Sequence, residues 1–493
     1  QRKGMKMADR RSSKKDTGSK KTPGTGGKKT TGSKKTTATR SKKTKGTSGK
    51  RNVGRSSGRS ARPSRAKSAG KILADTTAAA ATPGLAEVER ERAFLDELIR
   101  RVVRECPRRQ PTSEDEARAL DIFLEELAEA GLETSEHHFE FNDSLYKNLV
   151  LHAGLGVAGT AVSGAVPLAG LSLHLLAAGS YLAESTRKAY VLRRLFRFKP
   201  SRNVLGVLPA EGDPALRIVL LGHADAAFTG MTFWPSIVRL SAMEGPEKLK
   251  FLRRGVQLMV TTQFMLAGCD AARMLLGPLA LPLRPIEYVL TLPSVLALVL
   301  NGHVVLKNEI VPGANDNLSG SAALPVLARR LAPVKHPDVE LVFCVTGCEE
   351  ASLGGADALA RDMEGVWDKE RTVVIALDSL SNGDLRYLDV EGEVRPRKIP
   401  RWLSSLIEET AAADPRFSEV TGYEVPVGGS DAAAFQARGW NAVGLTCLDP
   451  EYGPPREYHL PTDDPEHLDL DKILFSIDFA EKLVERLMAS RLG

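Results

Sequence analysis

Cysteine and aromatic residues are scarce in this chain of 493 residues. Its five cysteines are scattered along the sequence, at Cys106, Cys269, Cys344, Cys348 and Cys447. An odd and scattered set does not form a disulfide framework, so we expect five buried thiols in a reducing compartment. Cys344 and Cys348 have the spacing of half a zinc site, but no second pair completes it. The sequence therefore excludes a disulfide-stapled secreted domain.

Acidic residues are almost absent from one segment. Residues 1–71 contain 25 Lys and Arg against two acidic residues, whereas the remaining chain holds 43 against 59. The basic segment repeats Lys-Lys with Thr, Gly and Ser and has too little apolar surface to offset its ordering entropy, so we predict a disordered tail over 1–83. Such a tail attracts anionic lipid or nucleic acid without sequence specificity, unless it is only a solubilising extension. No apolar region follows the early basic residues, which argues against a secretory signal.

The remaining chain alternates between helical and strand-like apolar patterns. The predicted helices cover 86–103, 113–130, 322–331, 402–412 and 471–488, and the predicted strands cover 134–141, 203–208, 217–221, 339–346, 372–377 and 442–446. Alternation of this kind is typical of an α/β fold whose central sheet is covered by helices on both faces.

Two apolar regions interrupt this pattern. Residues 148–183 contain no Lys, Arg, Asp or Glu, and residues 255–306 contain only four. One membrane span needs about 20 residues, so the first region is either a hairpin of two short helices or one span with a buried segment. Seven basic residues follow within 187–202, as the positive-inside rule expects on the cytoplasmic side.

We therefore expect a membrane-associated protein with a cytoplasmic catalytic domain, the alternative being a soluble cytoplasmic protein whose helical insertions pack on the body. The predicted division is a tail at 1–83, one α/β domain built from 84–147, 187–250 and 307–493, and two apolar helical insertions at 148–186 and 251–306, each a possible membrane contact.

Histidines and carboxylates lie at the ends of the strand-like runs. His223 and Asp225 follow RIVLLG, Glu349 and Glu350 follow VELVFCVTGC, Asp378 follows RTVVIAL, Asp316 lies in the turn VPGANDNLSG, and His459 lies in a proline-bounded loop. Two imidazoles and several carboxylates suit a pair of zinc or similar divalent ions that share one carboxylate. Such a pair can activate water and polarise a carbonyl, so the pattern predicts a hydrolase.

The order His-x-Asp, Gly-Ala-Asn-Asp-Asn-x-Ser-Gly, Glu-Glu, Leu-Asp, Gly-Ser-Asp and Tyr-His resembles the M28 zinc peptidases, the co-catalytic di-zinc aminopeptidase family. The resemblance covers about residues 107–491, apart from the apolar insertions. It implies a central mixed β-sheet flanked by helices, as in zinc aminopeptidases and related phosphorylase/hydrolase-like folds.

The resemblance also implies a role for each motif residue. Asp316 would bridge two Zn²⁺ ions. His223 and Asp378 would complete one site, and Glu350 and His459 the other. Glu349 would be the general base, Asp225 would support His223, and Ser430 and Asp431 would contact the peptide substrate, although Ala432 stands where the family often has His.

The activity implied is zinc-dependent cleavage of an amide bond next to a free amino terminus. Two alternatives keep the fold: glutaminyl-cyclase-like acyl transfer with one zinc, and a catalytically inactive binding protein. The complete set of motif residues argues against both.

Overall fold

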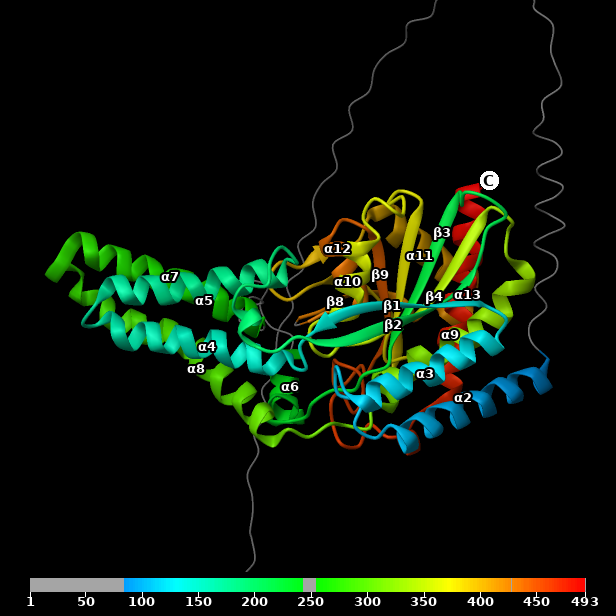
Figure 1. Ribbon diagram of the computed structural model, residues 1–493, viewed down its shortest axis with the longest axis horizontal. Coiled ribbons are helices and arrows are strands. Elements are labelled where there is room, and N and C mark those ends of the chain that lie inside the picture. Colours follow the sequence, from blue (N-terminus) through cyan, green and yellow to red (C-terminus); the bar gives the residue numbers. More distant parts are fainter. Residues whose placement is uncertain (1–83, 243–253, 427, 493) are drawn as a thin grey trace, which may run out of the picture. The chain divides into compact units, whose positions relative to one another are not determined.

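A nine-stranded mixed sheet, its covering helices and a bundle of apolar helices make up the described part of the chain (Figure 1). The computed structural model describes residues 84–242, 254–426 and 428–492. The predicted tail at 1–83 lies outside the described residues. The mixed α/β fold is the one that the sequence predicted.

The sheet has the strand order β1-β2-β4-β3-β5-β9-β6-β7, and β8 pairs with β6. Its strands are β1 (Glu133–Phe141), β2 (Lys199–Leu208), β3 (Leu216–His223), β4 (Val339–Thr346), β5 (Thr372–Leu377), β6 (Asp384–Glu391), β7 (Arg397–Lys398), β8 (Thr421–Glu424) and β9 (Asn441–Leu448). The four central strands β4, β3, β5 and β9 are parallel, whereas β1, β2 and β6 pair with their neighbours in antiparallel fashion, except for the parallel β6–β8 pair.

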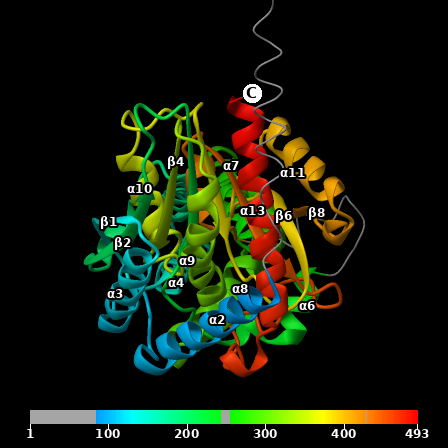
Figure 2. The ribbon, with the colours of Figure 1, turned by 90° about the vertical axis from the view of Figure 1, so that its right-hand side faces the viewer.

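Alternating side chains of the central strands pack against helices on both faces. In β3, Ile218 and Leu220 join one core cluster and Val219 and Leu221 the other, as the two-residue period of a strand requires. Helices α2 (Leu85–Glu105), α3 (Glu114–Glu129), α9 (Gly320–Leu331), α11 (Arg401–Ala413) and α13 (Leu470–Leu492) cover the first face, and α10 (Gly354–Asp362) and α12 (Asp431–Ala437) cover the second. Figure 2 shows α13 beside α2 and α9.

Local sequence explains where the predicted helices begin. Ser113 is the N-cap of α3: its hydroxyl accepts a hydrogen bond from the Glu116 amide at 3.1 Å, and acidic residues occupy the first turn. The short elements β6, β7, β8, α6 (Pro235–Ala242), α10 and α12 were not predicted. Among the cysteines, Cys269 is half-buried, so the expectation of five buried thiols was wrong for that residue.

The two apolar insertions form a bundle of four helices. Helices α4 (Leu145–Ser163) and α5 (Pro167–Ser185) make one hairpin, and α7 (Gly255–Leu276) and α8 (Arg284–Lys307), joined by a 3-10 turn at Gly277–Leu283, make the other. Each hairpin contacts the other, and the bundle extends away from the sheet (Figure 1). The first apolar region is therefore a helical hairpin, the first of the two arrangements expected for it.

Polar side chains point into this bundle and apolar side chains point out of it. The His174 ring and the Asp270 carboxylate are both buried and lie 2.8 Å apart, and Arg273 donates two hydrogen bonds to buried Glu287. On the outside, Leu275 is 85% exposed and Leu279 82%. Of the described residues, the stretch Gly255–Lys307 is long and apolar enough to cross a membrane, and an 18-residue window within it has a mean hydropathy of 2.0.

The basic segment that follows α5 is only partly exposed. Arg193 is fully buried and forms an ion pair with Glu184 at 2.7 Å. Arg187 is also buried and donates to the Ser352 carbonyl at 2.8 Å. The exposed basic residues here include Lys188, Arg194 and Arg197. Two of the seven basic residues therefore hold the base of the bundle to the segment after β4, and Lys188, Arg194 and Arg197 leave positive charge on the surface.

Candidate metal centre

Three parallel strands deliver four of the predicted site residues to one edge of the sheet. His223 is the last residue of β3, Asp378 follows β5, and Glu349 and Glu350 come three and four residues after β4. Because β4, β3 and β5 are adjacent and parallel, their carboxyl ends meet. This edge is where open α/β sheets place their ligands.

Two loops bring the other predicted ligands to the same edge. Asp316 lies in a tight turn, Ala314–Ser319, just before α9. The Asp463 carboxylate accepts hydrogen bonds from the amides of Asn315 at 2.7 Å and Asp316 at 3.1 Å, which holds this turn in place. His459 lies between β9 and α13, and its ring centre is 4.4 Å from that of Phe233 and 4.0 Å from that of Tyr458.

The Asp316 carboxylate lies between the two imidazoles. Its Oδ1 is 3.2 Å from Nε2 of His223, and its Oδ2 is 3.1 Å from Nε2 of His459. Nε2 of His459 is also 3.3 Å from Oε1 of Glu350, and Nε2 of His223 is 3.8 Å from Oε2 of Glu349. One carboxylate that offers an oxygen to each of two histidine sites has the geometry of a bridging ligand.

The donor atoms suit divalent metal ions. Ligand atoms of His223, Asp316 and Glu350 lie within 4.8 Å of one another, and so do those of His223, Glu349 and Asp378. Nε2 of His223 and Oε1 of Glu350 are buried and have no hydrogen-bond partner among the described residues. Buried polar atoms normally have partners, so these atoms are placed as ligands would be. Imidazole nitrogen with carboxylate oxygen is a donor set that zinc accepts.

The centre concentrates acidic groups away from water. Burial raises the pKa of Asp378 to about 7 and that of Asp463 to about 8, with the charge on Asp316 adding to both shifts. Burial opposes the charged form of His459, but the Glu350 and Asp316 carboxylates outweigh it and raise its pKa to about 10. Burial likewise opposes ionisation of Asp316, but its close contacts with the His223 and His459 imidazoles outweigh it and hold its pKa below the usual range. A bound divalent cation would supply the charge that this cluster demands.

Asp225 makes contacts different from those expected. Its Oδ1 accepts the Glu349 amide at 3.0 Å, and its Oδ2 accepts the Glu350 amide at 2.9 Å. Nδ1 of His223 lies 3.1 Å from the backbone carbonyl of Asp225 and 3.7 Å from its Oδ1. The backbone carbonyl is thus the nearer partner of the ring, and the carboxylate mainly holds the segment that carries both glutamates.

Arg109 links the segments that carry the metal-site residues and was not found from the sequence. Its side chain is fully buried and donates to the carbonyls of Ala224 at 2.8 Å, Pro312 at 2.8 Å and Gly313 at 3.2 Å. Burial lowers its pKa to about 10. No local pattern marks this arginine, because these three carbonyls lie more than 100 residues away along the chain. The sequence gives a weak indication of Asp463, because acidic residues follow His459 in the same loop.

The predicted substrate residues Ser430 and Asp431 begin α12. The amide and hydroxyl of Ser430 donate to Oε2 of Glu391 at 2.8 and 3.0 Å. Asp431 is buried and accepts a hydrogen bond from the Thr346 hydroxyl, while Ala432 is fully buried. Burial raises the pKa of Glu391 to about 8. Ser430 and Glu391 line the cavity described next, whereas Asp431 is not among its lining residues.

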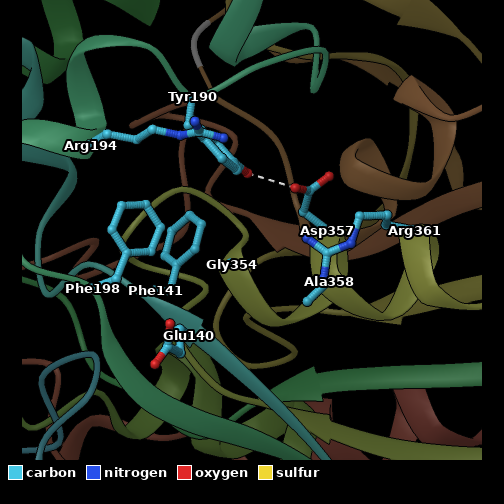
Figure 3. Close-up of a pocket in the computed structure, with 9 residues that line it drawn as sticks. All are labelled: Glu140, Phe141, Tyr190, Arg194, Phe198, Gly354, Asp357, Ala358 and Arg361. Carbon is cyan, nitrogen blue, oxygen red and sulfur yellow. Dashed lines mark hydrogen bonds between the residues drawn. The ribbon is translucent and has the colours of Figure 1, made fainter.

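A cavity of about 1260 Å³ opens onto the centre. Its lining includes Asp316, Glu349, Glu350, Asp378 and His459 together with side chains of the bundle. A smaller cavity of about 190 Å³ lies near the end of α5. The Tyr190 hydroxyl donates to Asp357 at 2.6 Å there, and Phe141 and Phe198 also line this cavity (Figure 3). None of the predicted metal ligands lines the smaller cavity.

A mixed sheet with histidines and carboxylates gathered at its carboxyl edge is the arrangement that the sequence predicted. The family model described as peptidase family M28 matches residues 293–483. This region carries seven of the nine predicted site residues, which are Asp316, Glu349, Glu350, Asp378, Ser430, Asp431 and His459. This match agrees with the M28 resemblance that the motifs predicted.

Solved structures with a similar fold include a zinc aminopeptidase from Bacillus subtilis, with 13% identity and a TM-score of 0.47 over 80% of this chain and 94% of that chain. An aminopeptidase from Aneurinibacillus sp. strain AM-1 has 16% identity and a TM-score of 0.47 over 80% and 93%. An Acidobacteriales bacterium glutaminyl cyclase has 13% identity and a TM-score of 0.45 over 81% and 94%. No curated protein matches the sequence.

Proposed function

We propose that this protein is a membrane-associated, aminopeptidase-type hydrolase that holds two zinc ions and cleaves the amide bond next to the free amino terminus of a peptide. The observation that carries this proposal is the position of Asp316, whose two oxygens lie 3.2 Å from His223 Nε2 and 3.1 Å from His459 Nε2. A single buried carboxylate between two imidazoles fits a shared ligand better than it fits any one ion pair.

Each metal would have its own pair of further ligands. His223 and Asp378 would hold one ion with Asp316, and Glu350 and His459 would hold the other. When bound, the two zinc ions lower the pKa of a water molecule and polarise the substrate carbonyl. The Glu349 carboxylate would take the proton from that water and pass it to the leaving nitrogen. Burial raises the pKa of Glu349 well above its usual range, which suits a group that must hold a proton between these steps.

A free amino terminus needs an acidic partner, and two carboxylates are available. Glu391 and Glu393 both line the cavity. Glu391 is fixed by Ser430 and Gln436, whereas Glu393 accepts a hydrogen bond from the Tyr181 hydroxyl at 2.9 Å and keeps some exposure. Either carboxylate would pair with a substrate ammonium, and their presence supports the aminopeptidase assignment.

Two alternatives make different predictions. A glutaminyl-cyclase-like acyl transferase would need one zinc, and the Glu350–His459 pair supports a second. An inactive binding protein would not need Glu349 next to the metal ligands. Zinc content per chain, release of nitroaniline from aminoacyl nitroanilides and cyclisation of glutaminyl peptides separate the three functions.

The change Glu349→Gln tests the proposed chemistry. The amide cannot accept the proton, so turnover should fall by about 10²- to 10⁴-fold while zinc stays bound. Zinc is measured by elemental analysis and turnover with an aminoacyl nitroanilide. Glu370→Gln, at an exposed position, is the matched control. Unchanged turnover in Glu349→Gln would refute the role of this residue.

The bundle supports the membrane part of the proposal. Its helices have 19 to 24 residues, or about 29 to 36 Å at 1.5 Å per residue, close to the ~30 Å hydrocarbon core of a bilayer. An apolar outside with charges inside is the arrangement that lipid favours. Each hairpin returns the chain to its starting side. The catalytic part and the basic tail would share the cytoplasm, where the tail would contact anionic lipid or nucleic acid.

Fractionation tests this part independently of catalysis. The protein should stay with membranes after a carbonate wash, and protease added outside intact cells should cut neither the tail nor the catalytic part. Release of the protein by the wash would refute the proposed membrane association without affecting the proposed hydrolase activity.

A further inference from the structure

The cavity at the metal centre continues along the apolar bundle. On the bundle side it is lined by Leu149 of α4, Met259 of α7, and Val289, Leu292, Leu296 and Leu300 of α8. On the sheet side it is lined by the metal-site residues and by polar groups that include Arg187, Glu393 and Ser430. One wall is therefore apolar and the other is polar, and the reactive centre lies between them.

The apolar wall is longer than one amino-acid side chain. Its residues on α8 run from Val289 to Leu300, which is about 16 Å along the helix axis. The whole cavity, at about 1260 Å³, exceeds the roughly 300 to 1,000 Å³ typical of small-molecule sites. A pocket for a single leucine or phenylalanine side chain would need only a small part of this space.

Aromatic rings connect the apolar wall to a metal-site residue. The ring centre of Tyr146, at the start of α4, is 6.0 Å from that of Phe233. The Phe233 ring is 4.4 Å from His459 and 5.8 Å from Tyr458. Tyr146 and Leu149 belong to one hydrophobic cluster with Phe233 and Met259. Apolar surface therefore reaches from the bundle to the metal centre.

We infer that the substrate is an amphiphile: an amide with a free amine and a long hydrocarbon chain on its acyl side. The chain would lie against α4, α7 and α8 while the carbonyl lies at the metal centre and the leaving group lies on the polar wall. This inference rests on the proposed function and names its substrate class. Water adds across the C–N bond, with hydroxyl going to the acyl carbon and a proton to the nitrogen, and the products are a long-chain amino acid and an amine.

The exterior of the same helices fits this substrate. Leu292 and Leu296 line the cavity and are also 60% and 58% exposed, so the apolar wall is continuous with the apolar outside of the bundle. A molecule with a long hydrocarbon chain partitions into lipid, where the outside of the bundle is proposed to lie. The chain could then pass along α8 without leaving an apolar environment.

A chain-length series tests the inference. The probes are 2-aminoalkanoyl nitroanilides with unbranched side chains from one to ten carbons, each used below the concentration at which it forms micelles. Because each buried methylene contributes about 0.8 kcal/mol, kcat/KM should rise about fourfold per carbon well beyond the length of leucine. A plateau or a decline at leucine length would overturn the inference while leaving the hydrolase assignment intact.

Matched tryptophan variants locate the binding surface. Leu296→Trp narrows the cavity and should lower the ratio of kcat/KM between the longest and shortest probes at least tenfold. Leu176→Trp, an exposed α5 position that does not line the cavity, should keep the wild-type ratio. Equal ratios in both variants would contradict the assigned surface.

Binding to the Glu349→Gln variant separates this inference from the proposed function. Calorimetry with long-chain and short-chain 2-aminoalkanoic acids needs no turnover. Tighter binding of the long acids supports the inference even if every nitroanilide is left uncleaved, a result that would refute the proposed hydrolysis. Equal binding of long and short acids overturns the inference.

Discussion

Replacement of Asp225 by Asn should weaken metal binding although Asp225 is not itself a predicted ligand. Its carboxylate accepts the amides of Glu349 and Glu350 at 3.0 and 2.9 Å. Asparagine has the same shape but only one accepting oxygen, so its amide nitrogen would face one of these backbone N–H groups. The segment that carries the proposed base and a proposed ligand would lose one of its two anchors.

The size of this effect follows from the contact that is lost. A hydrogen bond to a charged group contributes about 1.5 to 3 kcal/mol, and a buried donor left without a partner adds to the cost. The main consequence is a change of position: the segment can shift, and Glu349 and Glu350 shift with it. Loss of such an outer contact typically lowers metal affinity about 10- to 100-fold, or about 1.4 to 2.8 kcal/mol, which agrees with the loss of one bond.

Competition for zinc with a chelator of known affinity measures the change, and a thermal melt of the zinc-free protein measures the general loss of stability. Asp357→Asn is the matched control: Asp357 is buried and accepts hydrogen bonds from Arg438 and Tyr190, away from the predicted ligands. The control should lose stability but keep its zinc affinity. If Asp225→Asn binds zinc as tightly as the wild type, the two amide contacts do not position the ligands.

Two further outcomes follow from the centre. Removal of zinc by a chelator should lower the melting temperature, because a ligand present at a thousand times its Kd stabilises the folded state by about 4 kcal/mol. Scanning calorimetry before and after zinc is restored measures this change. An unchanged melting temperature would show that zinc does not stabilise the fold. Arg109→Lys should lower the free energy of unfolding by about 3 kcal/mol or more, since an ammonium cannot reach the carbonyls of both loops. Arg108→Lys, at the exposed neighbouring position, is the control in urea unfolding, and equal midpoints would refute the bracing role.

Four of the predicted site residues lie at or near strand ends, because each of them follows a strong local pattern in the sequence. His223, Glu349, Glu350 and Asp378 follow the apolar runs Ile218–Leu221, Leu341–Val345 and Val373–Leu377 within a few residues, and parallel strands bring the ends of these runs together without further information. Their metal-binding roles remain predictions. By contrast, β6 has the sequence DLRYLDVE, in which charges weaken the strand pattern, and the seven residues of α12 are too few to show a helical period.

The other omissions concern contacts between distant segments. Arg109 reaches carbonyls 115, 203 and 204 residues further along the chain, and a backbone acceptor leaves no signature in the sequence. The composition of the sequence showed where the apolar insertions lie, but it did not show that their charged side chains point into the bundle. Asp270 and Arg273 are three residues apart on α7, yet they contact different partners, His174 and Glu287. Packing of four helices decided those pairings.

The second hairpin is inserted at a place where its two ends meet. It lies between His223 and Asp316, yet its entry and exit segments run side by side: the Thr229 amide donates to the Glu309 carbonyl at 3.0 Å, and the Val311 amide donates to the Ala227 carbonyl at 3.0 Å. A two-glycine linker in place of residues 231–307 would therefore close the same gap. Because the predicted ligands and Asp225 all lie outside that stretch, this variant should still bind zinc, although it loses the Phe233 ring that packs on His459. It should lose any preference for long hydrocarbon chains, and the remaining α4–α5 hairpin alone should retain it less firmly on membranes. Circular dichroism checks that the sheet still folds, and loss of zinc from a folded variant would show that the bundle helps to build the centre.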